Sequence, residues 1–149
     1  MTYSGSYGVL LALHLITVAF IVGPLAVAAS LSGRYAKEGN AGALRAAART
    51  TKGYGYASFA TVLLGSAMLG RTAPHWSASQ AWVGASYALW LVAVGLCLLV
   101  VAPAQQQALV ALDAGEPADG FAKRIAPAAG VASLAWTAII VLMVFKPGA

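Results

Sequence analysis

Charged residues are scarce in this sequence. Asp, Glu, Lys and Arg make up 9% of its 149 residues, whereas 60% of the residues are hydrophobic. A soluble domain carries about 25% charged residues, which cover its surface with polar groups. The shortage therefore excludes a soluble globule and predicts that lipid surrounds much of the chain.

Acidic residues and cysteine are scarcer still. The four acidic residues, Glu38, Asp113, Glu116 and Asp119, all lie between the long apolar runs. Proton pumps and cation carriers usually need carboxylates inside the membrane, and hydrolytic enzymes need a base beside their nucleophile. The sequence contains neither pattern, so we expect no catalytic residues and no enzymatic activity. The single Cys97 excludes an internal disulfide.

Four long apolar runs are present instead. They cover residues 7–31, 55–70, 81–102 and 127–145. The first run contains no charged residue, and at about 1.5 Å per residue it exceeds the roughly 30 Å hydrocarbon core of a bilayer. Joined by short connections, the runs predict an all-α polytopic membrane protein. Its single domain over residues 1–149 would be an antiparallel up-down bundle of four transmembrane helices.

The connections predict the orientation of this bundle. Seven of the nine Lys and Arg residues lie between the first two runs or between the last two, and Arg71 and Lys146 lie on the opposite side. The positive-inside rule then places both termini outside and the two longer connections in the cytoplasm. This distribution explains the net charge of +5, so we do not expect nucleic acid as a partner.

The basic residues of the first connection share one side of a short predicted helix that begins at residue 41. Arg45, Arg49 and Lys52 follow one another at spacings of four and three residues, which place them on one helix face. There they are suited to contact anionic lipid or an acidic partner. The alternative, which we favour, is a solvated loop on the cytoplasmic side.

Small residues in the runs predict helix packing. Ala57, Thr61 and Gly65 recur every four residues in the second run and form a stripe that another helix can approach closely. In the first run Gly23 would admit a neighbouring backbone. Pro24 lacks an N–H and therefore predicts a kink over residues 20–24.

His14 is the residue of the first run with the most chemical potential. The expected topology brings His75, Met68 and Met143 to the same outer layer of the membrane. Imidazole and thioether groups are ligands of haem iron and copper(I). A haem b or copper site on these residues is therefore one hypothesis. The alternative, which we favour, is that no cofactor is bound and His14 donates an interhelical hydrogen bond.

The first run also resembles a known family. Leu13-His14-Leu15 is followed by an apolar stretch and Gly23. This pattern resembles the opening helix of copper-resistance D-like proteins and of related bacterial integral membrane families of unknown function. In its Ala- and Gly-rich, four-run character the chain is similar to accessory subunits of actinobacterial respiratory assemblies, such as the cytochrome bcc–aa3 supercomplex. That likeness implies a subunit without cofactors.

Three functions are compatible with these features. The first is a non-catalytic accessory or structural subunit of a larger respiratory, electron-transport membrane complex, with lipid and other integral membrane subunits as partners. The second is a membrane protein that binds haem b or copper through His14. The third is a small transporter or channel, which the lack of charge within the runs disfavours.

Overall fold

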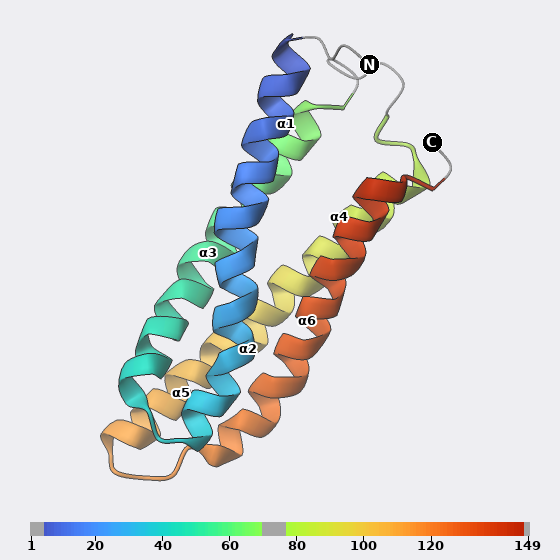
Figure 1. Cartoon of the computed structure of the whole chain (residues 1–149). Coiled ribbons are helices and arrows are strands. Elements are labelled where there is room, and N and C mark those ends of the chain that lie inside the picture. Colours follow the sequence, from blue (N-terminus) through green and yellow to red (C-terminus); the bar gives the residue numbers. More distant parts are fainter. Residues whose placement is uncertain (1–4, 70–76, 148–149) are drawn as a thin grey trace.

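The computed structural model describes residues 5–69 and 77–147, and the regular structure within these ranges is helical (Figure 1). The elements in chain order are α1 (Gly5–Thr17), the π-helical η1 (Val18–Val22), α2 (Gly23–Lys37), α3 (Ala41–Ala67), α4 (Ala81–Gly95), the π-helical η2 (Leu96–Val101), α5 (Ala102–Asp113) and α6 (Asp119–Phe145). The all-α prediction is confirmed for this part of the chain.

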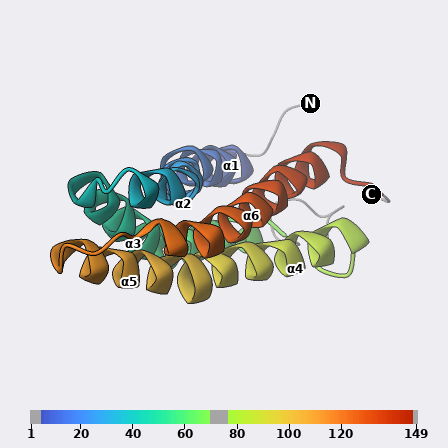
Figure 2. The same cartoon turned by 90° about the horizontal axis from the view of Figure 1, so that it is seen from below.

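The elements join into two successive hairpins of matching size. One continuous helix of 33 residues comprises α1, η1 and α2, and α3 follows it with 27 residues. A second continuous helix of 33 residues comprises α4, η2 and α5, and α6 follows it with 27 residues. Figure 2 shows the two composite helices as continuous rods. The halves of the sequence are alike only in hydropathy, so the repeat becomes visible only in the structure.

Each composite helix contains a π-helical turn directly before a proline. Pro24 is the second residue of α2, and Pro103 is the second residue of α5. A proline has no N–H, and its ring collides with the carbonyl four residues earlier, so the helix widens at that point. In the first case the Gly23 N–H donates to the carbonyl of Val18, five residues back. The irregularity expected over residues 20–24 takes this form.

Three helices are long and apolar enough to cross a membrane: Gly5–Lys37, Ala81–Asp113 and Asp119–Phe145. Of the four expected spans, therefore, only three are membrane-span candidates by length and composition. The fourth helix, α3, is more polar because its first half carries three basic residues. The polar flanks continue the same helices, so that α3 begins at Ala41 rather than near residue 55.

Many large apolar side chains point outwards from this bundle, and many of its buried residues are small. Leu99, Phe145 and Leu134 are 78%, 76% and 71% exposed, whereas Ala108 and Ala122 are completely buried. Such a surface is unfavourable in water, but in lipid it is the expected arrangement, because small residues let helices approach each other. The distribution indicates a membrane-embedded protein.

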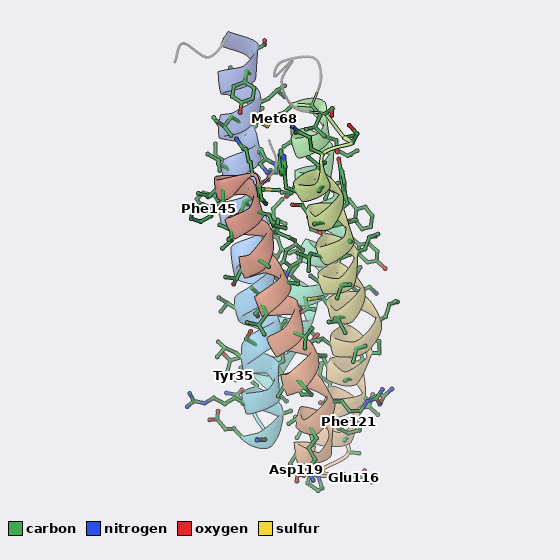
Figure 3. The ribbon with its side chains drawn as sticks, turned by 90° about the vertical axis from the view of Figure 1, so that its right-hand side faces the viewer. Tyr35, Met68, Glu116, Asp119, Phe121 and Phe145 are labelled. Atoms are coloured by element: carbon green, nitrogen blue, oxygen red, sulfur yellow. The ribbon has the colours of Figure 1, made fainter. Side chains whose placement is uncertain are left out.

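The bundle has a closed end and an open end. At the closed end α2 packs against α3, α5 and α6. At the open end α1 packs against α3 and α4 packs against α6, and these two pairs, which we call the arms, diverge (Figure 1). The beginning of α1 and the end of α6 both lie at the open end (Figure 1). Figure 3 shows Met68 and Phe145 at this end and Tyr35 and Phe121 at the other. The side of the membrane that each end faces stays a prediction.

Polar side chains join three helices inside the closed end. The Gln105 side-chain amide in α5 donates to Ser32 Oγ in α2 at 2.5 Å and to Thr51 Oγ1 in α3 at 3.0 Å. All three residues have no exposed surface. At the surface nearby, Arg45 of α3 pairs with Asp113 of α5 through two contacts of 3.0 and 3.1 Å. The closed end is thus fastened by hydrogen bonds as well as by packing.

Candidate functional site

A cavity of about 340 Å³ lies between the two arms at the open end. Its walls come from α1, η1, α3, α4 and α6, and most of the lining side chains are aliphatic or aromatic. The aromatic residues of the lining are Tyr7, Trp82, Tyr87, Trp90 and Trp136. The cavity is therefore an apolar space that the divergence of the arms leaves open.

His14 is the most distinctive polar residue of this lining. The side chain is 6% exposed, and its Nδ1 lies 3.0 Å from the main-chain carbonyl of Thr61 in α3. Because a carbonyl oxygen can only accept, Nδ1 carries a proton and donates it, and the neutral ring then has its lone pair on Nε2. Nε2 has no hydrogen-bond partner among the described residues. The predicted interhelical hydrogen bond of His14 is confirmed, and it leaves one acceptor nitrogen in the lining of the cavity.

Gly65 makes room for the His14 ring. A Cβ atom at residue 65 would lie 3.0 Å from Cε1 and 3.3 Å from Nδ1 of His14. Thr61, one turn earlier on α3, supplies the carbonyl that accepts from His14. Two of the three residues in the predicted small-residue stripe, Thr61 and Gly65, therefore contact the His14 ring. The third, Ala57, is half-buried.

Three hydroxyl groups of the lining donate their protons within the protein. Ser66 Oγ donates to the carbonyl of Val62 at 2.7 Å, and Ser86 Oγ donates to the carbonyl of Trp82 at 2.8 Å. The Tyr87 hydroxyl lies 2.5 Å from Ser66 Oγ. Since the Ser66 proton is engaged with Val62, Tyr87 is the donor in this contact. These three side chains therefore offer lone pairs, not protons, to the cavity.

Side-chain contacts between α4 and α3 cross from one arm to the other. Tyr87 of α4 reaches Ser66 of α3, and the Trp90 Nε1–H of α4 donates to Ser58 Oγ of α3 at 3.3 Å. The Trp90 ring also meets Phe59 edge-on, with the ring centroids 4.7 Å apart. Long aromatic side chains thus connect the arms where their backbones have separated.

Three further indole and hydroxyl donors of the lining are engaged or enclosed. Trp82 Nε1–H donates to the side-chain oxygen of Gln80 at 3.2 Å. Trp136 Nε1 and Thr61 Oγ1 have no hydrogen-bond partner within the described chain, but both atoms have almost no accessible surface. They therefore do not present a donor to the cavity.

Lys146 is the one charged side chain among the described lining residues. It follows the last turn of α6 in a left-handed conformation with φ of 42°, and its main-chain N–H donates to the carbonyl of Leu142 at 2.8 Å. Burial lowers the pKa of the Lys146 ammonium group from its ordinary value. Among the described lining residues, positive charge thus lies only at the end of α6.

The structure brings together three of the four residues proposed as haem or copper ligands. His14, Met68 and Met143 all line the cavity. His75, the fourth, lies outside the described residues. Within the described part of the chain no group of three His, Cys, Asp or Glu side chains is placed to hold a metal ion.

Sequence reasoning did not assign the aromatic lining to a site. Trp82, Ser86 and Trp90 follow one another at spacings of four residues on α4, and all three line the cavity. This spacing places them on one helix face. Two tryptophans and a serine on one face of an apolar helix were therefore the sequence pattern that could have indicated this lining.

The other residues singled out from the sequence lie away from the cavity. Gly23 is exposed, and a Cβ built there meets nothing within 4 Å, so no described helix packs on it, and its packing against a helix of another protein stays a prediction. Arg45 pairs with Asp113, whereas Arg49 and Lys52 are exposed. Contacts of these basic residues with lipid or a partner stay a prediction.

Comparison of the chain with protein-family models, with curated proteins and with solved structures finds no match. The resemblances noted for the first run and for the whole chain therefore stay predictions. The geometry of the cavity is the remaining basis for a functional argument.

Proposed function

We propose that this protein is a non-enzymatic, membrane-embedded binding protein whose cavity accepts an apolar ligand. The observation that carries the proposal is the apolar space of about 340 Å³ beside a nearly buried His14 with an unpartnered nitrogen. Ligand sites typically measure roughly 300–1,000 Å³ and combine apolar walls with a few polar groups that orient the ligand. The cavity meets both conditions.

The ligand would reach this cavity from the bilayer. The arms diverge at the open end, and their outer surfaces carry exposed apolar side chains such as Leu63 of α3 and Phe145 of α6. In a membrane these surfaces face acyl chains, so the gap between the arms opens into the hydrocarbon region. A molecule dissolved in the bilayer could therefore bind without crossing water.

Tryptophan quenching in vesicles tests this proposal. Trp82, Trp90 and Trp136 line the cavity, and replacing Trp76 by Phe in every sample removes the fourth tryptophan of the chain. A brominated alkyl probe added to the vesicles should quench the three indoles saturably, at a lower bromine content than random lipid collisions require. Quenching that only follows the bulk bromine content would contradict a binding site.

A matched pair of variants localises the signal. Val62 lines the cavity, whereas its neighbour Leu63 is 70% exposed on the outer face of α3. Val62→Phe fills part of the cavity and should weaken saturable quenching, while Leu63→Phe should leave it unchanged. Equal effects of the two variants would place the probe on the outer surface instead.

A second candidate function is haem b or copper binding, which one specific observation favours. The unpartnered Nε2 of His14 and the thioethers of Met68 and Met143 line the same cavity, and these groups are suitable ligands for haem iron or copper(I). Haem would supply electron transfer, and copper(I) would be a bound cargo. A Soret band, or copper at one equivalent, in protein purified from membranes and absent in His14→Ala would support this candidate.

An accessory role in a respiratory complex also stays a prediction. The exposed apolar side chains on the outer faces of the helices fit other subunits as well as they fit lipid. Copurification of oxidase subunits with the full chain in mild detergent would support it. Monodisperse protein without partners would leave ligand binding as the better account.

A further inference from the structure

We propose that the polar head of the ligand is a neutral hydrogen-bond donor, an alcohol or phenol hydroxyl, which donates to Nε2 of His14. This inference rests on the proposed binding function and specifies the chemistry of the ligand. It follows from the polar groups around His14, where Nε2 of His14 is an acceptor and the protons of Ser66, Ser86 and Tyr87 are engaged within the protein.

The state of His14 is the first step. Nδ1–H donates to the carbonyl of Thr61, so a second proton on Nε2 would make the ring a cation. The described residues that line the cavity include no carboxylate to balance that charge. A charge without a partner is costly in an apolar interior, so the ring is neutral and Nε2 is an acceptor.

The neighbouring hydroxyl groups also offer acceptors. The protons of Ser66, Ser86 and Tyr87 go to Val62 O, Trp82 O and Ser66 Oγ, as described above. Their oxygens keep lone pairs but have no free proton to donate. A ligand that carries a hydroxyl would therefore complement this lining, whereas a ketone or an ether would meet acceptors only.

Charged head groups are also excluded from the inner cavity. A cationic amine would find no carboxylate among the described lining residues. A carboxylate or phosphate would need donors, and the one cation in the described lining is Lys146 at the end of α6. A neutral hydroxyl needs neither and satisfies the acceptor nitrogen of His14.

The architecture around His14 fixes the position of this acceptor. The ring is fastened at Nδ1 by the Thr61 carbonyl and lies against Gly65, where a Cβ would come within 3.0 Å. A ring fastened on one nitrogen presents the other in a constant direction, which is how a binding site orients a ligand. His14 is therefore a specificity-determining residue of the cavity.

Four matched probes test the head group in the quenching assay. They are a bromododecanol, its methyl ether, the corresponding bromododecanoate, and a brominated alkylphenol, each in neutral phosphatidylcholine vesicles that contain the full chain. Because one neutral hydrogen bond contributes roughly 0.5–1.5 kcal/mol, the alcohol should bind about two- to tenfold more tightly than the ether. The phenol arm distinguishes an aromatic hydroxyl from an aliphatic one.

His14→Phe supplies the matched control. It should abolish the preference for the hydroxyl probes and leave binding of the ether nearly unchanged, which also shows that the variant is folded. If the wild-type chain binds all probes equally, water satisfies His14 and the inference is wrong while the binding function stands. A preference for the carboxylate would likewise overturn it and point to Lys146. If no probe quenches saturably, the binding function itself fails.

Discussion

The closed end and the open end of this bundle use different side chains to separate the same helices. At the closed end Ala36 of α2, Ala108 of α5 and Ala122 of α6 belong to one buried cluster, and none is more than 1% exposed. At the open end Trp82, Trp90 and Trp136 face the space between the arms. Alanine lets helix backbones come into contact, whereas tryptophans hold them apart and cannot fill an irregular gap completely.

The polar groups differ between the two ends as well. The side-chain amide nitrogen of Gln105 at the closed end donates to two other helices, and its Oε1 is enclosed without a hydrogen-bond partner in the described chain. His14 at the open end uses one nitrogen in this way and leaves the other for the cavity. In the proposed function, the closed end stabilises the bundle and the open end binds the ligand. Four sets of variants can test that division.

The largest effect is expected from crowding the closed end. Ala122→Leu adds a bulky side chain to α6 where the Ala122 carbonyl already lies 3.7 Å from a Cβ built on Gly33 of α2. Overpacking costs typically about 1–3 kcal/mol of the free energy of unfolding. Val131→Leu, on the exposed face of α6, is the control and should be nearly neutral. Thermal unfolding in detergent measures both, and equal stabilities would mean that the closed end is not tightly packed.

The next effect concerns the buried amide. Gln105→Ala removes two hydrogen bonds that join α5 to α2 and α3, and at about 0.6 kcal/mol for each bond inside a membrane protein it should cost about 1 kcal/mol. Gln107→Ala changes an exposed glutamine two residues further along the same helix and should be silent. A matched loss in Gln107→Ala would show that helix propensity, and not the buried contact, is responsible.

A smaller change in stability, with a larger change in recognition, is expected at the open end. In Gly65→Ala the gain in helix propensity, roughly 0.5–1 kcal/mol, opposes the contact of the new Cβ with His14. The net change in unfolding free energy should therefore be small, while the preference for a hydroxyl probe falls because the ring is displaced. Gly84→Ala, where a Cβ meets nothing within 4 Å, should be stabilising and keep the preference. Identical probe binding in both variants would remove Gly65 from the site.

The smallest effect is expected from the surface ion pair. Arg45 and Asp113 are 47% and 60% exposed, so Asp113→Asn should cost at most about 1 kcal/mol, and less at high salt. Glu116→Gln removes the same charge from an exposed residue of the adjacent connection and serves as the control. A large, salt-independent loss in Asp113→Asn would mean that charge contributes more to the closed end than packing does.

Residues that act through local pattern were recognised from the sequence. His14 as an interhelical donor, the stripe of Thr61 and Gly65, and the irregular helix before Pro24 all follow from side-chain chemistry and helical spacing. The packing role of Gly23 stays a prediction, because a small residue permits a close approach and no described helix makes one there. Whether α3 crosses the membrane stays a prediction, because its apolar half is continuous with a basic half and α3 is not among the three span candidates.

Composition and hydropathy by themselves determined that this is an all-helical, membrane-type chain, since a sequence with so few charges and such long apolar runs has few other stable arrangements. They also determined which residues carry donors and acceptors. Only the tertiary structure decided that His14, Met68, Met143 and three tryptophans, two from α4 and one from α6, surround one cavity. The physical reason is that each helix satisfies its own backbone, so the divergence of the arms depends on how side chains of different helices fit together, which no single segment specifies.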